Sequence, residues 1–443
     1  MMDVVEAAGV PMPVAPRNIE ESGLNIDLIT QLALKTLHLA GTLTGLELAT
    51  RLGLQFAVIE PSLDDVKWQH HVEIVAGSTI GGAAYKYRIT DAGRERAALF
   101  MEQNHYVGVA PVPLEQYRRY LESFRRNTLN YTSPDRVREA FKSMVLSDRV
   151  LDQLGPAVRA GRSLFVYGPP GNGKTVISQC IRHLLRGEIA VPHALEVEGA
   201  IVRFFDPVNH EEITAAPSAP EGEAPLDLGY VADARWVRCQ RPSITVGGEL
   251  TLDALELNYS PSSGFYRAPV QAIANGGVLV IDDFGRQHCS ARDLLNRWIV
   301  PLESGMDYLS LQTGQKFDLP FVVLVVFATN LKPAELVDEA FLRRIRYKVF
   351  AESPTHADFI RIFEDYCARV HVSFERELVE RLLVECLRPR KIPLRGCQPG
   401  ALIDQALALA EYLGQDRRLT MDLLTAASDS YFVDDRETPT EYA

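Results

Sequence analysis

The sequence contains a glycine-rich loop whose residue types could hold a chain of phosphates. Residues 168–175 read GPPGNGKT, follow an apolar run at 164–167 and precede a helical pattern at 176–185. The glycines allow successive backbone N–H groups to face an anion, and the start of the next helix adds positive potential. Lys174 would contact the β- and γ-phosphates, and the Thr175 hydroxyl would contact Mg2+. The predicted nucleotide-binding residues are Gly168, Pro169, Pro170, Gly171, Asn172, Gly173, Lys174 and Thr175.

Two adjacent carboxylates follow a second apolar run. Residues 276–283 read GGVLVIDD, which predicts a buried strand that ends at Asp282 and Asp283. Ligands of open α/β sheets bind beyond the carboxyl ends of the strands, so these acids are expected beside the phosphates. Asp282 is predicted to hold Mg2+, directly or through water, together with Thr175. Asp283 is predicted to orient and polarise the attacking water.

These two motifs resemble the Walker A and Walker B elements of AAA+ ATPases, and the resemblance covers about residues 132–432. It implies an α/β fold, in which a P-loop NTPase core with a parallel sheet precedes a C-terminal helical lid. It also implies ATP and Mg2+ as cofactors and ATP hydrolysis as the activity. Asn330, after the apolar run 321–327, resembles the sensor 1 residue that positions the water. A helix cap is the alternative for this asparagine.

Residues 338–344, DEAFLRR, resemble the arginine-finger segment of Clp-type disaggregases. Arg343 and Arg344 are therefore candidate catalytic residues, with a solvated basic helix end as the alternative. The segments GGEL at 247–250 and SGFYRAP at 263–269 are similar to the helix-2-insert group, which includes MoxR-like proteins. Members of that group form rings, so the resemblance implies self-association with a hexamer as the expected size.

The sequence departs from the AAA+ pattern at two positions. The second Walker B acid is usually Glu, whereas Asp283 is one methylene shorter. Gly400 occupies the place of the usual sensor 2 arginine, and Arg395, five residues upstream, is a possible substitute. Both departures leave open a nucleotide-controlled scaffold that hydrolyses ATP weakly.

The first hundred residues resemble a winged-helix domain. Helical patterns at 26–39, 46–52 and 61–70 precede two alternating segments, 71–76 and 83–90, and a helix is predicted at 91–103. Residues 1–104 contain eight Lys/Arg and thirteen Asp/Glu, a net charge of −5. This charge disfavours DNA, because phosphate contacts need a basic surface, and it favours a protein partner. Trp68 is expected in the core, with a partner contact as the alternative.

Length and composition predict a protein of two or three domains. The chain has 443 residues, 47% hydrophobic and 23% charged, with a net charge of −12. Its six cysteines form no CxxC pair, and its longest apolar run, 319–328, is too short to span a bilayer. No membrane insertion and a cytoplasmic location are therefore expected. The predicted division is a flexible arm (1–22), a winged-helix-like domain (23–105), a linker and connecting helix (106–131), an ATPase core (132–351), a helical lid (352–433) and an acidic tail (434–443).

The sequence therefore predicts an oligomeric ATPase that uses ATP to remodel an unidentified protein client recruited by the N-terminal domain. The first alternative is an ATPase that acts on DNA, such as a transcription activator or a helicase loader. The second is the weakly hydrolysing scaffold.

Overall fold

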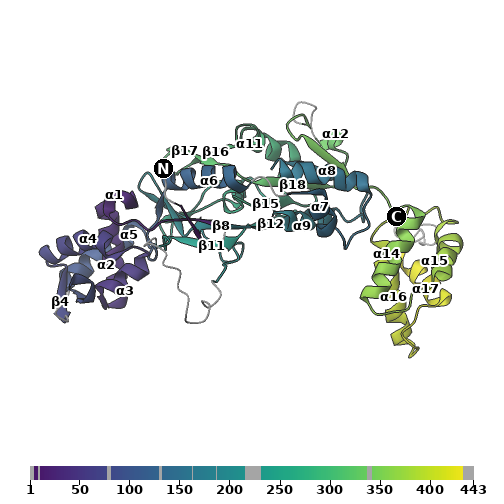
Figure 1. Cartoon of the computed structure of the whole chain (residues 1–443), viewed down its shortest axis with the longest axis horizontal. Coiled ribbons are helices and arrows are strands. Elements are labelled where there is room, and N and C mark those ends of the chain that lie inside the picture. Colours follow the sequence, from purple (N-terminus) through teal and green to yellow (C-terminus); the bar gives the residue numbers. More distant parts are fainter. Residues whose placement is uncertain are drawn as a thin grey trace, which may run out of the picture. The chain divides into compact units, whose positions relative to one another are not determined.

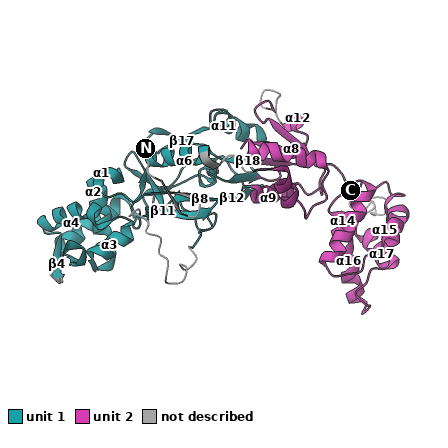
Figure 2. Cartoon of the chain, in the orientation of Figure 1, with its two compact units in different colours: residues 1–131, 185–280, 286–325 teal, residues 132–184, 281–285, 326–443 magenta. Residues whose placement is uncertain are grey.

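The computed structural model describes residues 4–7, 10–76, 81–128, 132–161, 163–185, 187–214, 231–336 and 342–432. Two compact units, each built from separate stretches of chain, are shown in Figure 2. The sequence predicts residues 185–280 as part of the ATPase core, whereas their contacts within the chain group them with the N-terminal residues. The acidic tail 434–443 and the hairpin tip at 77–80 lie outside the described residues. Unit 1 comprises residues 1–131, 185–280 and 286–325, and unit 2 comprises 132–184, 281–285 and 326–443.

The N-terminal part of unit 1 packs helices against a small antiparallel sheet (Figure 1). The strand order is β3-β5-β4, and Ile29, Leu32 and Leu37 of α2 are fully buried at helical spacing. A capping box between Thr44 and Glu47 starts α3. The elements are α2 (Ile26–Ala40), β3 (Thr42–Thr44), α3 (Gly45–Leu52), α4 (Phe56–Trp68), β4 (Val72–Ala76), η1 (Gly82–Ala84), β5 (Lys86–Ile89) and α5 (Asp91–Gln103).

Helix α4 differs from its predicted form in two ways. It begins at Phe56, and Pro61, predicted as its first residue, lies inside it. Trp68 is 81% exposed, so the expectation of a core tryptophan is wrong. The buried face of α4 includes Leu63 and Val66. Because Trp68 comes two residues after Val66, it lies on nearly the opposite side of the helix.

The rest of unit 1 combines β-structure with the connecting helix α6. A five-stranded sheet has the order β13-β14-β10-β9-β6, and β8 pairs with β11. Tyr117, Tyr120 and Phe124 of α6 are buried in the same cluster as Trp236. The elements are β6 (Val112–Pro113), α6 (Leu114–Thr128), β8 (Glu188–Pro192), β9 (Ala194–Val197), β10 (Ala200–Arg203), β11 (Trp236–Gln240), β12 (Ser243–Val246), η2 (Asp253–Leu255), β13 (Asn258–Ser260), β14 (Phe265–Arg267), α10 (Val270–Ile273), α11 (Ala291–Ser304), β16 (Met306–Ser310) and β17 (Lys316–Pro320).

Residues 10–22 are held by backbone pairing, which corrects the expectation of a flexible arm for this stretch. Strands β1 (Val4–Ala7) and β2 (Val10–Pro13) are antiparallel, and α1 (Ile19–Ser22) follows. The Ala15 N–H donates to the Val231 carbonyl at 2.8 Å, and the Asp233 N–H donates to the Pro13 carbonyl at 2.9 Å. The partner residues lie more than 200 positions away, so no local pattern indicates this pairing.

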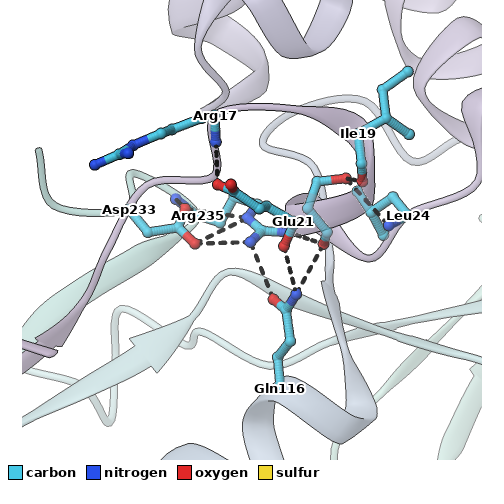
Figure 3. Close-up of polar contacts among 8 residues, drawn as sticks. Arg17, Ile19, Glu21, Leu24, Gln116, Asp233 and Arg235 are labelled. Atoms are coloured by element: carbon cyan, nitrogen blue, oxygen red, sulfur yellow. Dashed lines mark hydrogen bonds and ion pairs between the residues drawn. The ribbon is translucent and has the colours of Figure 1, made fainter. Parts of the chain in front are cut away.

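A buried ion pair fastens this N-terminal stretch to the rest of unit 1 (Figure 3). Arg235 and Asp233 are each 1% exposed and pair at 2.8 Å. Arg235 Nη1 donates to the Ser22 carbonyl at 2.9 Å, and Nη2, which also contacts Asp233, donates to Gln116 Oε1 at 3.1 Å. Gln116 Nε2 in turn donates to the Glu21 carbonyl at 3.0 Å. One cation therefore joins α1, α6 and the start of β11.

Replacement of Asp233 by Asn should strongly destabilise unit 1, because a buried guanidinium would lose its counter-ion. We expect a loss of about 3–5 kcal/mol in the free energy of unfolding. Glu73→Gln is the control, since Glu73 pairs with Arg88 at the surface and should cost less than about 1 kcal/mol. Urea unfolding followed by tryptophan fluorescence reports on this unit, because Trp68, Trp236 and Trp298 all belong to it. Equal losses in the two variants would contradict the proposed role of the ion pair.

Unit 2 has the predicted α/β class with a parallel sheet. Strand β7 pairs in parallel with β18 on one side and with β19 on the other, and β15 lies beyond β18. The expected helices after residue 358 are present and enclose their own apolar cluster. No helix among the described residues is long and apolar enough to cross a membrane. The elements are α7 (Pro134–Ala140), α8 (Asp148–Arg159), β7 (Leu164–Tyr167), α9 (Lys174–Leu184), α12 (Pro333–Leu336), β19 (Tyr347–Phe350), α14 (His356–Arg369), α15 (Arg376–Leu382), η3 (Leu383–Leu387), α16 (Gln398–Tyr412) and α17 (Met421–Tyr431), together with β15 (Val278–Ile281) and β18 (Leu324–Thr329), which enter unit 2 at Ile281 and Val326.

Candidate nucleotide-binding site

The loop at 168–175 connects the buried strand β7 to helix α9. Gly168, Gly171 and Gly173 have φ angles of 147°, 80° and 72°, a region that L side chains rarely adopt. A Cβ atom at Gly168 would lie 2.6 Å from the Ala351 carbonyl oxygen, so this position also needs glycine for space. The backbone is therefore free to curl tightly in front of the N-terminus of α9, as a phosphate cradle requires.

The ammonium group of Lys174 lies within the curl of the loop. Lys174 Nζ donates to the carbonyls of Gly168 at 3.0 Å and Pro169 at 2.8 Å, and the residue is 7% exposed. Burial lowers the pKa of Lys174, whereas the carboxylates of Asp282 and Asp283 act to raise this pKa. A cation is thus held beside two carboxylates where phosphate oxygens would enter.

The structure joins the predicted metal ligands directly. Thr175 Oγ1 donates to Asp282 Oδ2 at 2.8 Å. A hydroxyl and a carboxylate are the hard oxygen donors that Mg2+ prefers, and such sites complete their coordination with phosphate oxygens and water. Together with the narrow, left-handed glycine loop, this donor set fits a magnesium-bound nucleoside triphosphate.

Asp283 and Asn330 lie beside the metal ligands. Asp283 has a φ angle of 48°, and its N–H donates to Asp282 Oδ1 at 3.0 Å. Asn330 Nδ2 donates to Asp283 Oδ1 at 3.3 Å. Thr329 Oγ1, at the end of β18, donates to the Phe284 carbonyl at 2.7 Å and ties the two strand ends together. Four predicted site residues, Thr175, Asp282, Asp283 and Asn330, therefore form one connected group.

A segment of the helical lid contacts the loop in a way that the sequence analysis missed. The Cys397 N–H donates to the Gly171 carbonyl at 2.9 Å, and the Gly396 N–H donates to Asn172 Oδ1 at 3.4 Å. Asn172 Nδ2 donates to the carbonyl of Ala351 at 3.3 Å. Asn172 is thus the link between the loop, the end of β19 and the lid. Its position in the motif gave no signal of this role.

Gly400, predicted at the place of the usual sensor 2 arginine, packs closely against an aromatic ring. A Cβ atom at this position would lie 2.6 Å from the Tyr366 ring, whose hydroxyl donates to Asp404 at 2.6 Å. A larger residue at this position would require the Tyr366 ring to move. Arg395 lies nearer the loop, since a Cβ atom at Gly171 would be 3.5 Å from Arg395 Cβ. Its guanidinium donates to Ser353 Oγ at 2.6 Å.

The two candidate finger arginines lie on the segment that precedes β19. Arg343 is exposed and Arg344 is half-buried. Residues 337–341, which include most of the predicted finger segment, lie outside the described residues.

Comparisons with known proteins cover parts of the chain. A family profile described as "Domain of unknown function (DUF8689)" matches residues 355–430, the helical lid. Replication factor C small subunits 1 and 2 of Pyrobaculum aerophilum are each 31% identical over 97 residues, which is 21% of this chain. The match spans about 30% of the length of these relatives.

Solved structures of low sequence identity are also similar. The RuvB Holliday junction branch migration motor of Thermotoga maritima has a TM-score of 0.38 and 15% identity, covering 66% of this chain and 71% of that one. NtrX of Brucella abortus in complex with ADP has a TM-score of 0.39 and 12% identity, covering 69% of this chain and 59% of that one.

Proposed function

We propose that this chain is an ATPase of the AAA+ type that binds Mg2+ and ATP at residues 168–175. The hydrogen bond between Thr175 and Asp282, at 2.8 Å, carries the proposal, because it joins the two motifs that the chemistry needs. The left-handed glycines and the enclosed Lys174 support the same assignment. The partial match to Replication factor C small subunits agrees with it.

Each residue of the group has a proposed task. Lys174 Nζ would exchange the loop carbonyls for β- and γ-phosphate oxygens, which accept stronger, charge-assisted hydrogen bonds. Thr175 and Asp282 would hold Mg2+, which neutralises charge that develops on the phosphates. Asp283 would orient the attacking water and accept its proton. Asn330 would fix the Asp283 carboxylate through its contact at 3.3 Å.

Asp283→Asn tests the role of this carboxylate. The variant should bind ATP with nearly wild-type affinity, because it leaves the loop and Asp282 intact. Turnover should fall by about 10²–10⁴, the usual contribution of a general base. Calorimetry measures ATP binding, and phosphate release measures turnover. The control is Asp365→Asn, an exposed acid of α14. Wild-type turnover in Asp283→Asn would show that this carboxylate does not activate water.

A protein client is the favoured partner, and the surface of the N-terminal domain supports it. Several of its basic side chains pair with acids of the same domain, which reduces the positive charge available to phosphates. These pairs are Lys67–Asp64 at 2.7 Å, Arg88–Glu73 at 2.7 Å and Arg94–Asp91 at 3.4 Å. Trp68 is 81% exposed and Leu46 62% exposed, as in surfaces that bind proteins.

A DNA-acting ATPase remains the second candidate. The order of helices, strand and hairpin in the N-terminal domain supports the winged-helix interpretation, and such domains include DNA-binding ones. The Replication factor C relatives, whose name refers to replication, favour the same alternative. Micromolar binding of the full chain to duplex DNA, weakening steeply with added salt, would favour it over a protein client.

Self-association into a ring, with a hexamer as the expected size, would let Arg343 and Arg344 act on a neighbour's nucleotide. An arginine finger stabilises charge on the transferring phosphoryl group and contributes on the order of 10³–10⁵ in rate. The exposure of Arg343 supports a contact outside its own chain.

A mixing experiment tests this arrangement. The double variant Arg343→Ala with Arg344→Ala should bind ATP but lose turnover, and Lys174→Ala should also be inactive. A mixture of the two should regain part of the activity, since some interfaces would pair an intact loop with intact arginines. Native mass spectrometry establishes that mixed oligomers form. If they form and the mixture stays inactive, the arginines do not act between subunits.

A further inference from the structure

A cavity of about 350 Å³ lies in unit 1, away from the proposed nucleotide site. It lies between the segment that follows α5 and the strands β10 and β14. Its volume is within the range of small-molecule sites, about 300–1,000 Å³. The lining residues are His105, Tyr106, Val107, Gly108, Val109, His193, Arg203, Phe205 and Phe265.

Two of the lining rings, Phe205 and His193, belong to a group of three rings in contact. The Phe205 ring meets the His193 ring edge-on at 5.5 Å and stacks on His210 at 5.6 Å. His210 is held on both ring nitrogens, since Nδ1 accepts from the Asp206 N–H at 3.0 Å and Nε2 donates to the Ile273 carbonyl at 2.9 Å. Phe205 therefore keeps its orientation without a ligand, which lowers the entropic cost of binding.

The lining contains a second pair of rings in contact. Tyr106 and Phe265 meet edge-to-face at 5.8 Å. The Tyr106 hydroxyl donates to the Val109 carbonyl at 2.6 Å, which closes residues 106–109 into a compact loop. A Cβ atom at Gly108 would meet nothing within 4 Å, so this loop leaves open space beside it. The cavity thus has aromatic walls from two separate segments of the chain.

Three basic side chains, Arg203, His105 and His193, line the cavity, and none of its lining residues is a carboxylate. Over the described part of the chain, the Arg203 guanidinium has neither a hydrogen bond nor an ion pair. Burial lowers the pKa of His193, and the nearby Glu212 carboxylate, which does not line the cavity, acts to raise it. In a chain of net charge −12, an arginine left without a carboxylate is available to an anion.

We propose that this cavity binds a small aromatic carboxylate, with its ring against the aromatic lining and its carboxylate on Arg203. Aromatic rings stabilise each other in offset or edge-to-face contacts, which both walls offer. A guanidinium donates two parallel hydrogen bonds to a carboxylate. A phosphate ester is less suited, because the lining offers one guanidinium for a doubly charged group.

Such a ligand would contact two parts of unit 1 that already touch each other. The His105 N–H donates to the Ser263 carbonyl at 2.7 Å, and the Ala110 N–H donates to the Leu52 carbonyl at 2.8 Å. The segment 105–109 thus connects the N-terminal helices to the sheet of β10 and β14. A ligand that binds only this folded arrangement stabilises it, so it should raise the melting temperature of unit 1.

The experiment uses the full chain with phenylacetate and indole-3-acetate as probes, and the uncharged amides of both as controls. Saturation-transfer NMR detects binding, and calorimetry measures the dissociation constants. We expect each carboxylate to bind about tenfold more tightly than its amide, as a charge-assisted hydrogen bond predicts. Arg203→Met should remove that tenfold advantage. Arg51→Met, at an exposed arginine of α3 outside the lining, should leave it unchanged.

A second variant distinguishes loss of the binding site from misfolding of the protein. Phe265→Leu keeps the arginine and shortens one aromatic wall, so it should weaken indole-3-acetate binding while circular dichroism matches the wild type. Absence of binding by both carboxylates in the wild type would overturn the proposal. Equal binding of acid and amide, or wild-type affinity in a folded Arg203→Met variant, would also overturn it. Inorganic phosphate that binds as tightly as the aromatic acids would indicate a plain anion site and reject the aromatic ligand.

Discussion

The hydrogen bond between Thr175 and Asp282 joins two residues that are 107 positions apart in the chain. It exists because β7 and β15 end at the same edge of a parallel sheet, where the loop at 168–175 also begins. The surrounding polar contacts follow from this position. Asp283 is held by its N–H on Asp282, and Asn330 contacts Asp283 from the end of β18. Lys174 is enclosed by the loop, and the negative charges of Asp282 and Asp283 act to raise its pKa.

The residues between the two motifs do not belong to the compact unit that holds the site. After α9 the chain enters unit 1, where residues 185–280 build strands with α6 and the N-terminal residues, and it returns to unit 2 at Ile281. Within unit 1, the buried Arg235 fastens α1 and α6 to the start of β11. The N-terminal domain is attached to the sheet of strands β9 and β10 by direct contacts and not only by a linker, since Ala194 and Ile201 are buried in its apolar cluster. A partner that binds the N-terminal domain would act first on that sheet.

The sequence predicts those parts of the site in which a polar or glycine-rich segment directly follows an apolar strand pattern. The glycine loop, the acid pair after an apolar run and Asn330 after another run all follow strand ends, and the structure brings them together. The order of helices and hairpin in the N-terminal domain is also visible from periodicity, because its buried faces repeat at helical and strand spacing.

Features set by distant contacts could not be predicted. The space beside Gly400 is filled by the Tyr366 ring, a contact that no local pattern indicates. Residues 10–22 read as a flexible arm because their partners, Val231 and Asp233, lie far along the chain. Trp68 was expected in the core on residue type alone, yet it lies opposite the buried face of α4. In each case the environment of the residue depends on a contact with a residue distant in the sequence, and a single sequence does not identify that contact.

The central claim is that residues 168–175 and Asp282 together hold Mg2+ and ATP. Calorimetric titration of ATP with Mg2+ into Lys174→Ala, compared with the wild type, tests it most directly. Removal of the enclosed cation should weaken ATP binding by about a hundredfold, since it deletes charge-assisted hydrogen bonds to the phosphates. Thermal unfolding should remain close to that of the wild type, because the hydrogen bonds of the Lys174 ammonium to Gly168 and Pro169 lie within its own loop. Wild-type affinity for ATP in this variant would contradict the assignment of the loop as the nucleotide site.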